Sequence, residues 1–124
     1  MKLADKVAII TGGNSGIGKA TAILFAREGA QVCITGRNEK RCREVVEELN
    51  KIGGQAVFIT ADVRFPDECR KTVEATLEAF GRLDILFNNA GVYFPNNAVD
   101  CSEEEWDLTI DINLKGTYLM SKFA

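Results

Sequence analysis

The chain of 124 residues contains no histidine. This absence excludes a Ser-His-Asp triad, a Cys-His pair and any histidine-ligated metal site supplied by the chain, because each of them needs an imidazole. Cysteines are few and far apart, and they form no C-x-x-C motif. A fold built on disulfides would usually be denser in cysteine at this length, so we expect reduced thiols and a cytoplasmic location.

Long apolar runs and an excess of positive charge are also missing. No stretch is long enough to span a bilayer, and Asp5 and Lys6 precede the first short apolar run, unlike in a secretory signal. The formal net charge is −3, and no basic stripe with interleaved aromatic residues occurs, so neither nucleic acid nor a membrane is an expected partner. The remaining composition, 46% hydrophobic and 27% charged, is typical of one ordinary globular domain.

Four short apolar segments alternate with segments of helical periodicity. The predicted strands cover residues 6–11, 31–35, 56–60 and 83–87, and glycines mark the connections between strands and helices. This alternation predicts stacked right-handed βαβ units around a parallel sheet. The expected fold class is therefore α/β, a Rossmann-like doubly wound sheet with the strand order 3-2-1-4.

Capping residues predict where the helices begin and end. Asn38 occupies an N-cap position, and Ser102, with a glutamate three residues later, forms a capping box. Pro66 suits the first turn of a helix that Gly81 would end, whereas Phe65 replaces a small polar residue that could cap it. The predicted helices cover residues 18–28, 39–52, 66–80 and 103–110, and a last one begins near residue 113.

A glycine-rich turn, TGGNSGIG at residues 11–18, joins the first strand to the first helix. Glycine lets the backbone approach a pyrophosphate, and the free N–H groups of a helix N-terminus favour its negative charge. The spacing G-x-x-x-G-x-G differs from G-x-G-x-x-G, and the Lys-Ser/Thr pair of a nucleoside-triphosphate loop is missing. Taken alone, the segment also fits a glycine turn that binds nothing.

Three ordered motifs carry a resemblance to a known family. TGGNSGIG, then NNAG at residues 88–91 and NLKG at residues 113–116, resemble the motifs of short-chain dehydrogenases/reductases over essentially the whole chain. The resemblance implies that residues 1–124 form a single NAD(P)-binding domain, the N-terminal part of a longer fold truncated after the fourth strand and the start of the following long helix. It places the catalytic Ser and Tyr-x-x-x-Lys beyond residue 124.

The same resemblance implies roles for individual residues. The glycine-rich turn would hold the cofactor phosphates, and Thr11 would tie this turn to the NNAG loop. That loop would lie along the cofactor riboses, and Asn88 would also form a hydrogen bond with the backbone. Asp62 would bond the adenine amino group beside Val63; without the resemblance, we would interpret Asp62 as a loop carboxylate and NNAG as a simple turn. The implied cofactor-binding residues are Thr11, Gly12, Asn14, Ser15, Gly16, Ile17, Gly18, Arg37, Asp62, Val63, Asn88, Ala90 and Gly91.

The end of the second strand predicts which nicotinamide cofactor binds. A carboxylate there would accept bonds from the ribose hydroxyls and repel a 2′-phosphate, but the chain has Gly36 followed by Arg37. A guanidinium can contact phosphate through two N–H groups, so NADP(H) is favoured. NAD(H) is the alternative, because Ser15 stands where some NADP(H)-binding relatives carry a basic residue. Lys40 and Arg41 are expected on a solvated helix face.

Asn113 is the one catalytic position that the resemblance assigns to this chain. It would kink its helix and help to hold a water in a proton relay, or else be only a polar residue between two helices. Tyr118 and Lys122 reproduce the Y-x-x-x-K spacing, but Tyr118 follows Asn113 too closely. It matches a structural aromatic that packs under the sheet, so we interpret the spacing as a coincidence. Trp106 is expected to pack near the active-site rim.

Two classes of function follow. In the first, the parent protein is an NADP(H)-dependent oxidoreductase acting on the alcohol/carbonyl pair of a small molecule, and this chain supplies its cofactor-binding half. In the second, the chain is a non-catalytic nucleotide-binding or interaction fragment, or has no activity. The fourth strand would lack its next neighbour and present an unpaired edge, so we expect the chain to form a homo-oligomer, pair with a missing C-terminal half or aggregate.

Overall fold

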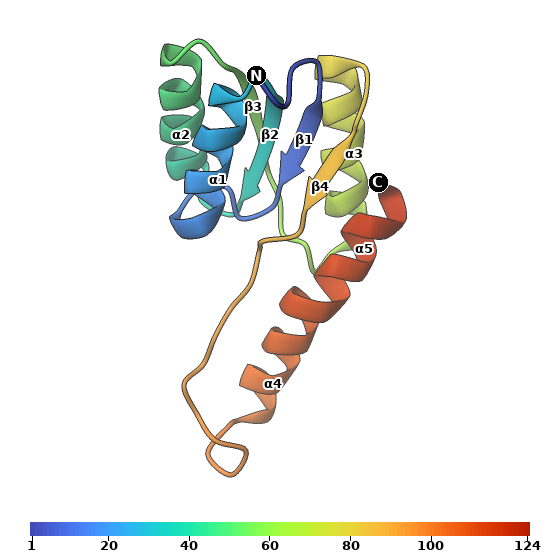
Figure 1. The fold of residues 1–124 in the computed structure, drawn as a ribbon. Helices are drawn as coiled ribbons and strands as arrows, with labels where there is room; N and C mark the ends of the chain where they lie inside the picture. The colour runs from blue at the N-terminus through green and yellow to red at the C-terminus, as the bar shows by residue number, and fades with distance from the viewer.

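A computed structural model describes all residues, 1–124. Its four strands, β1 (Val7–Ile10), β2 (Gln31–Gly36), β3 (Gln55–Thr60) and β4 (Ile85–Phe87), form one parallel sheet in the order β3-β2-β1-β4 (Figure 1). This confirms the predicted α/β class and the strand order. Because every strand runs the same way, all four carboxyl ends meet at one edge of the sheet.

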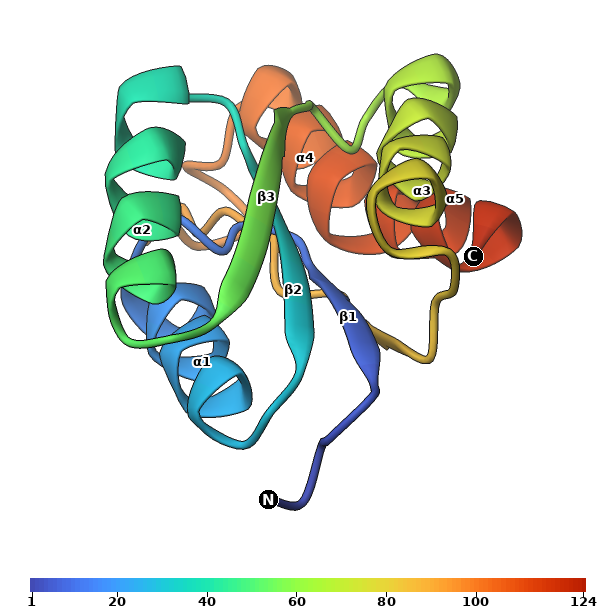
Figure 2. The ribbon, with the colours of Figure 1, turned by 90° about the horizontal axis from the view of Figure 1, so that it is seen from above.

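Helices cover both faces of the sheet (Figure 2). α1 (Gly16–Arg27) and α2 (Glu39–Lys51) pack on one face, while α3 (Pro66–Phe80) and α5 (Gly116–Phe123) pack on the other. The two central strands are buried along nearly their whole length, which explains why their sequences are continuous apolar runs rather than alternating ones. No helix of the structure has both the length and the apolar character needed to cross a membrane.

The last part of the chain extends away from this body. A loop after β4 leads to α4 (Glu103–Thr109), and the chain continues through a π-helical segment, η1 (Ile110–Lys115), directly into α5. We call residues 93–109 the arm; it projects beyond the ends of the strands (Figure 1). None of its residues is buried. The helix predicted to begin near residue 113 begins at Gly116, because the π-helical η1 occupies residues 110–115 between α4 and α5.

Most capping predictions are confirmed. The Asn38 side chain accepts a hydrogen bond from the Arg41 N–H at 3.0 Å, and the Ser102 hydroxyl accepts one from the Glu105 N–H at 3.1 Å. Gly81 ends α3 in the left-handed region with φ of 80°, and Phe65 caps α3 with no side-chain bond, as expected. The first helix begins at Gly16 rather than Gly18.

Two aromatic side chains differ from expectation. Tyr118 is 59% exposed and Trp106 is 61% exposed, so Tyr118 does not pack under the sheet and Trp106 packs against little of this chain. Burial of these side chains would need another part of a longer chain or another molecule.

Candidate functional site

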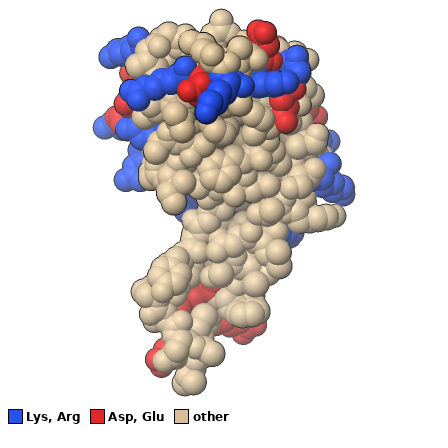
Figure 3. All heavy atoms as spheres, in the orientation of Figure 1, with Lys and Arg blue, Asp and Glu red and all other residues tan.

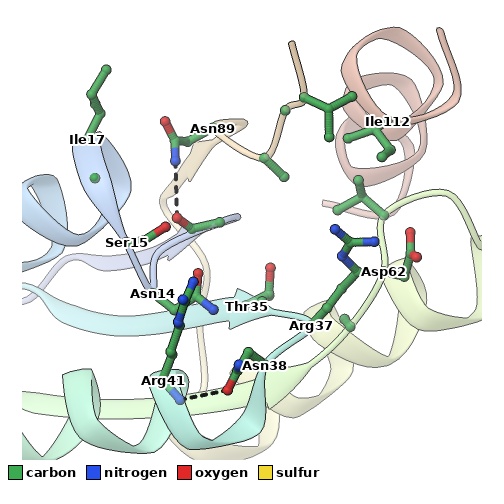
Figure 4. A pocket seen from close by; sticks show the side chains of 18 residues that line it. Asn14, Ser15, Ile17, Thr35, Arg37, Asn38, Arg41, Asp62, Asn89 and Ile112 are labelled. Atoms are coloured by element: carbon green, nitrogen blue, oxygen red, sulfur yellow. Dashed lines mark hydrogen bonds between the residues drawn. The ribbon is translucent and has the colours of Figure 1, made fainter. Parts of the chain in front are cut away.

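A pocket of about 450 Å³ opens at the carboxyl edge of the sheet. Its walls come from the segments that follow each of the four strands, together with Ile112 of η1 (Figure 4). Its volume lies within the usual range for small-molecule sites, about 300–1,000 Å³. The parallel topology therefore produces the pocket, since it brings four otherwise distant turns together.

The turn between β1 and α1 forms one wall. Gly18 packs so closely on it that a Cβ at this position would lie 2.3 Å from the Gly12 carbonyl oxygen. The N-cap residue Ser15 makes no side-chain cap bond, and the N–H groups of Gly16, Ile17 and Gly18 donate to no acceptor within the chain. Three free donors and the positive end of the helix dipole make this an anion-binding end.

Hydrogen bonds tie this turn to the loop after β4. The Thr11 hydroxyl oxygen accepts from the Asn89 N–H at 3.0 Å and from the Ala90 N–H at 2.9 Å. The Asn89 side chain donates to the Gly12 carbonyl oxygen at 3.2 Å. The contact implied for Thr11 is therefore present, and these bonds hold the two walls in register.

Asn88 requires a correction. Its side-chain amide donates to the Ser121 hydroxyl of α5 at 3.3 Å rather than to backbone, and it does not line the pocket. Successive residues of an extended segment point to opposite sides, so Asn89 faces the pocket when Asn88 faces α5. Of the two asparagines, Asn89 rather than the predicted Asn88 lines the pocket.

The end of β2 brings two arginines into the pocket. Arg37 lines it as predicted, and Arg41 from the first turn of α2 lines it as well, although we expected Arg41 on a solvated face. A Cβ at Gly36 would lie 2.4 Å from the Asn14 side-chain nitrogen, so glycine makes room for that amide. Asn14 and Arg41 are both among the residues that line the pocket (Figure 4).

Asp62, after β3, is held by its neighbour Arg64. One carboxylate oxygen accepts from the Arg64 backbone N–H and from Nε, and the other accepts from Nε and, at 2.7 Å, from a terminal guanidinium nitrogen. The Asp62 side chain is 13% exposed. The hydrogen bonds from Arg64 hold the pKa of the Asp62 carboxyl below its usual range, so a fixed anion forms part of the pocket wall.

Asn113 lies beside the pocket rather than in it. Its side chain accepts from the Val92 N–H at 2.8 Å and donates to the Val92 carbonyl oxygen at 2.9 Å. Both polar groups of the amide are thus engaged, and they fasten η1 to the loop after β4. Tyr118 and Lys122 do not line the pocket.

The structure brings most of the predicted residues together. The predicted pocket residues that line it are Gly12, Asn14, Ser15, Gly16, Ile17, Arg37, Asp62, Val63, Ala90 and Gly91. Thr11, Gly18, Asn88 and Asn113 do not line it, although Thr11 and Gly18 support its first wall. The lining residues missing from the predicted set are Thr35, Gly36, Asn38, Arg41, Ala61, Asn89, Val92 and Ile112. For Arg41, the sequence signal was its position in the first turn of the helix that follows β2 and is capped by Asn38.

A family model described as short chain dehydrogenase matches residues 6–124. Among curated proteins, an uncharacterized oxidoreductase of Thermotoga maritima is 45% identical over the whole chain, which spans 49% of that protein. A (2S)-[(R)-hydroxy(phenyl)methyl]succinyl-CoA dehydrogenase subunit of Thauera aromatica is 40% identical over 98% of the chain and again spans 49% of its relative. The chain thus covers about half the length of these relatives.

Solved structures agree in fold and coverage. A short chain dehydrogenase from Burkholderia cenocepacia in complex with NADP superposes with a TM-score of 0.94 at 37% identity, covering the whole of this chain and 51% of the other. One from Bacillus anthracis has a TM-score of 0.90 at 45% identity, covering 95% and 49%.

Proposed function

The chain belongs to the short-chain dehydrogenase family, and on that premise we propose that residues 1–124 form the NAD(P)-binding domain of an NADP(H)-dependent oxidoreductase. The parent protein would transfer hydride between the nicotinamide and the alcohol/carbonyl pair of a small molecule. A bound nicotinamide would supply that hydride transfer. This chain's own residues bind and orient the cofactor.

One observation carries this proposal: the pocket combines three kinds of group that a dinucleotide needs. The free N–H groups at the start of α1 suit a pyrophosphate. The fixed Asp62 carboxylate suits an amino-bearing base because it can only accept hydrogen bonds. The loop at residues 89–91 lies between the first wall and η1, where the riboses would extend toward the nicotinamide.

The preference for NADP(H) rests on charge at the end of β2. The segment directly after β2 carries no carboxylate, and Arg37 and Arg41 both reach the pocket, so a 2′-phosphate would meet two guanidinium groups there. A structural relative described as a complex with NADP supports the proposal.

Asn113 is proposed as a positioning residue for the proton relay. The oxygen and the nitrogen of its side-chain amide are both hydrogen-bonded to Val92. A relay water would therefore bind to backbone groups of η1 rather than to this side chain. A π-helical turn displaces the regular hydrogen-bond ladder, and such turns are frequent at functional sites.

The partners we propose are a small-molecule substrate and either a second copy of the chain or the remaining half of a longer fold. β4 pairs only with β1, which leaves one side of it without a strand. The exposed Leu114 and Tyr118 add apolar surface on η1 and α5. We propose a cytoplasmic location, because all four cysteines are free thiols. A single monomeric species in sedimentation at micromolar concentration would contradict the association.

The alternative is a nucleotide-binding module without turnover. The observation that favours it is that the pocket lacks a side chain that readily donates a proton near neutral pH. The ionisable groups of the pocket are Arg37, Arg41 and Asp62. Turnover of NADPH with a carbonyl substrate by the longer protein supports the enzyme. Cofactor binding without turnover by that protein supports the module.

The cofactor preference is tested by Arg37→Asp in residues 1–124. Losing charge-assisted bonds worth about 1.5–3 kcal/mol should weaken NADPH binding about 10- to 100-fold, while NADH binding should be unchanged or tighter. Arg70→Asp in α3 is the matched control, since Arg70 is exposed and outside the pocket. NADPH affinity that is unchanged in Arg37→Asp would contradict the preference.

A further inference from the structure

Asp62 is the one anion of the pocket, and two arginines stand near it. Arg64 binds both of its carboxylate oxygens, with nitrogen-to-oxygen distances of 2.7 to 3.1 Å. Arg37 faces the same carboxylate from the end of β2, and Figure 4 shows its guanidinium directed toward Asp62. Arg37 also contributes a small electrostatic lowering of the Asp62 pKa, after the larger effect of Arg64.

The two arginines differ in what they bind. Arg64 forms an ion pair with Asp62 and lies 5.2 Å from the centre of the Phe65 ring; it does not line the pocket. Arg37 lines the pocket but takes part in none of the ion pairs of the structure. One guanidinium is therefore committed to the carboxylate, and the other keeps its hydrogen-bond donors available.

We propose that Arg64 is a specificity-determining residue, which balances the charge of Asp62 in an ion pair and so leaves Arg37 free to bind the 2′-phosphate of the cofactor. This inference rests on the proposed preference for NADP(H). It assigns the choice of cofactor to a pair of arginines, of which only Arg37 would touch phosphate. Arg64 acts through Asp62 and is a positioning residue.

The physical basis is that a partly buried carboxylate needs a nearby cation. Asp62 is 13% exposed, and an unpaired charge at such a position is costly. Without Arg64, the guanidinium that already faces this carboxylate is that of Arg37, and a long, flexible side chain can turn to bind it. A 2′-phosphate would then compete with Asp62 for Arg37, whereas a ligand without that phosphate would lose nothing at this point.

Two other carboxylates face Arg64. Glu68 accepts a hydrogen bond from the Asp62 N–H at 3.0 Å, and Glu68 and Asp111 both act electrostatically on Arg64. Removal of Arg64 would therefore also leave a more negative surrounding, which could repel phosphate at longer range. The experiment must separate this general charge effect from capture of Arg37 by Asp62.

Adenosine 2′,5′-bisphosphate and 5′-AMP are suitable probes, because they differ only in the 2′-phosphate. Binding of both to residues 1–124 is measured by calorimetry for the wild type, Arg64→Met, Asp62→Asn and the double variant. The readout is the ratio of the two dissociation constants, which cancels general effects on folding and on adenine binding. Arg64→Lys is a fifth variant, which keeps the charge but cannot bind both oxygens in a fork.

Arg64→Met is expected to lower the preference for the bisphosphate about tenfold, in line with the loss of one charge-assisted contact. Arg64→Lys should lower it less, and Arg64→Met should change it less than twofold when Asp62 is already asparagine. An equal loss in the Asp62→Asn background, or full retention in Arg64→Lys, overturns the proposal in favour of general charge.

Failure of this inference and of the proposed cofactor can be told apart. A wild-type preference for the bisphosphate that survives Arg64→Met overturns the role of Arg64 alone. If the wild type binds both probes equally, the NADP(H) preference and the role of Arg64 fall together. Should Arg64→Met not fold, Arg64→Lys and the double variant carry the same comparison.

Discussion

The pocket end of the body and the arm belong to the same chain, but they differ in how far contacts within that chain bury and bond their residues. The central strands below the pocket are buried. Hydrogen bonds of Thr11 and Asn89 join the turn after β1 to the loop after β4, and Gly18 packs closely against Gly12. The arm has no buried residue. The proposed nucleotide site is therefore built from contacts within this chain, whereas the arm is exposed.

The distribution of charge supports the same contrast. Figure 3 shows Lys, Arg, Asp and Glu gathered at the upper end of the body, while the face around β4 carries few charged side chains. The tip of the arm is acidic, with Glu103, Glu104 and Glu105 in the first turn of α4. A broad uncharged face beside an open strand edge is a typical place for further protein to pack.

Of the changes in the pocket walls and in the arm, the largest effect is expected from Gly18→Ala in the turn after β1. Its Cβ would lie 2.3 Å from the Gly12 carbonyl oxygen, so α1 and the turn must separate. We expect a loss of about 3 kcal/mol in unfolding free energy and loss of cofactor binding, measured by thermal denaturation and calorimetry.

Lys19→Ala is the control for Gly18→Ala. Lys19 is the next residue of α1, and its ion pair with Glu48 at 3.2 Å is exposed, so the change should cost less than about 1 kcal/mol. Because alanine normally favours a helix over glycine, a stabilised Gly18→Ala chain would show that this close contact does not limit the fold.

A smaller effect is expected where the body and the arm are joined. Asn113→Ala removes two hydrogen bonds to Val92, and because they are exposed we expect a loss of about 1 kcal/mol. Amide exchange of Val92 should become faster, while that of the β1 amides stays unchanged. Uniformly faster exchange across the sheet would mean that η1 supports the whole body, contrary to the proposed separation. Tyr118→Phe, on exposed surface outside the pocket, is the matched control.

Thiol chemistry gives a further comparison. Burial raises the pKa of the Cys33 and Cys69 thiols to about 11, so both stay protonated and slow to alkylate at pH 8. Cys101, which directly precedes the N-cap of α4, is the only cysteine that is not buried and should react first. Mass spectrometry after a short iodoacetamide treatment tests this order, and Cys101→Ser should remove the fast reaction. Rapid alkylation of Cys33 would contradict a closed body.

The same thiols give the sign of a pH effect. Their folded pKa lies above the ordinary value of 9.0, so the folded state holds the proton more tightly than the unfolded state does. Their contribution to stability is complete below about pH 9 and declines as the pH rises toward 11. Cys33→Ala should flatten this decline in denaturant titrations.

The smallest effect is expected on the arm. Trp106→Ala should change the unfolding free energy by less than about 0.5 kcal/mol, because the side chain is 61% exposed. Leu119→Ala, a few turns later in the buried part of α5, should cost about 2–5 kcal/mol. Chemical denaturation of both variants gives the comparison; a large loss in Trp106→Ala would mean that the arm is already covered, for instance in an oligomer.

The sequence predicted the elements because their signals are local. Asn38, Ser102 and Gly81 act within a few residues of themselves, and the strand order follows from the βαβ pattern. The errors concern contacts between distant segments. Asn88 and Asn89 are indistinguishable as residue types, and η1 depends on Val92, 21 residues away. The exposure of Trp106 and Tyr118 depends on what else packs there, which periodicity does not encode.

The proposal that the start of α1, Arg37 and Asp62 form the cofactor site is tested most directly by NMR. Amide chemical-shift changes of residues 1–124 are measured as NADP⁺ is added. We predict that the largest shifts fall on Gly16, Ile17 and Gly18, whose N–H groups are free, and on Arg37 and Asp62, with no change over the arm. Shifts concentrated on residues 93–109, or none at the start of α1, would contradict the account.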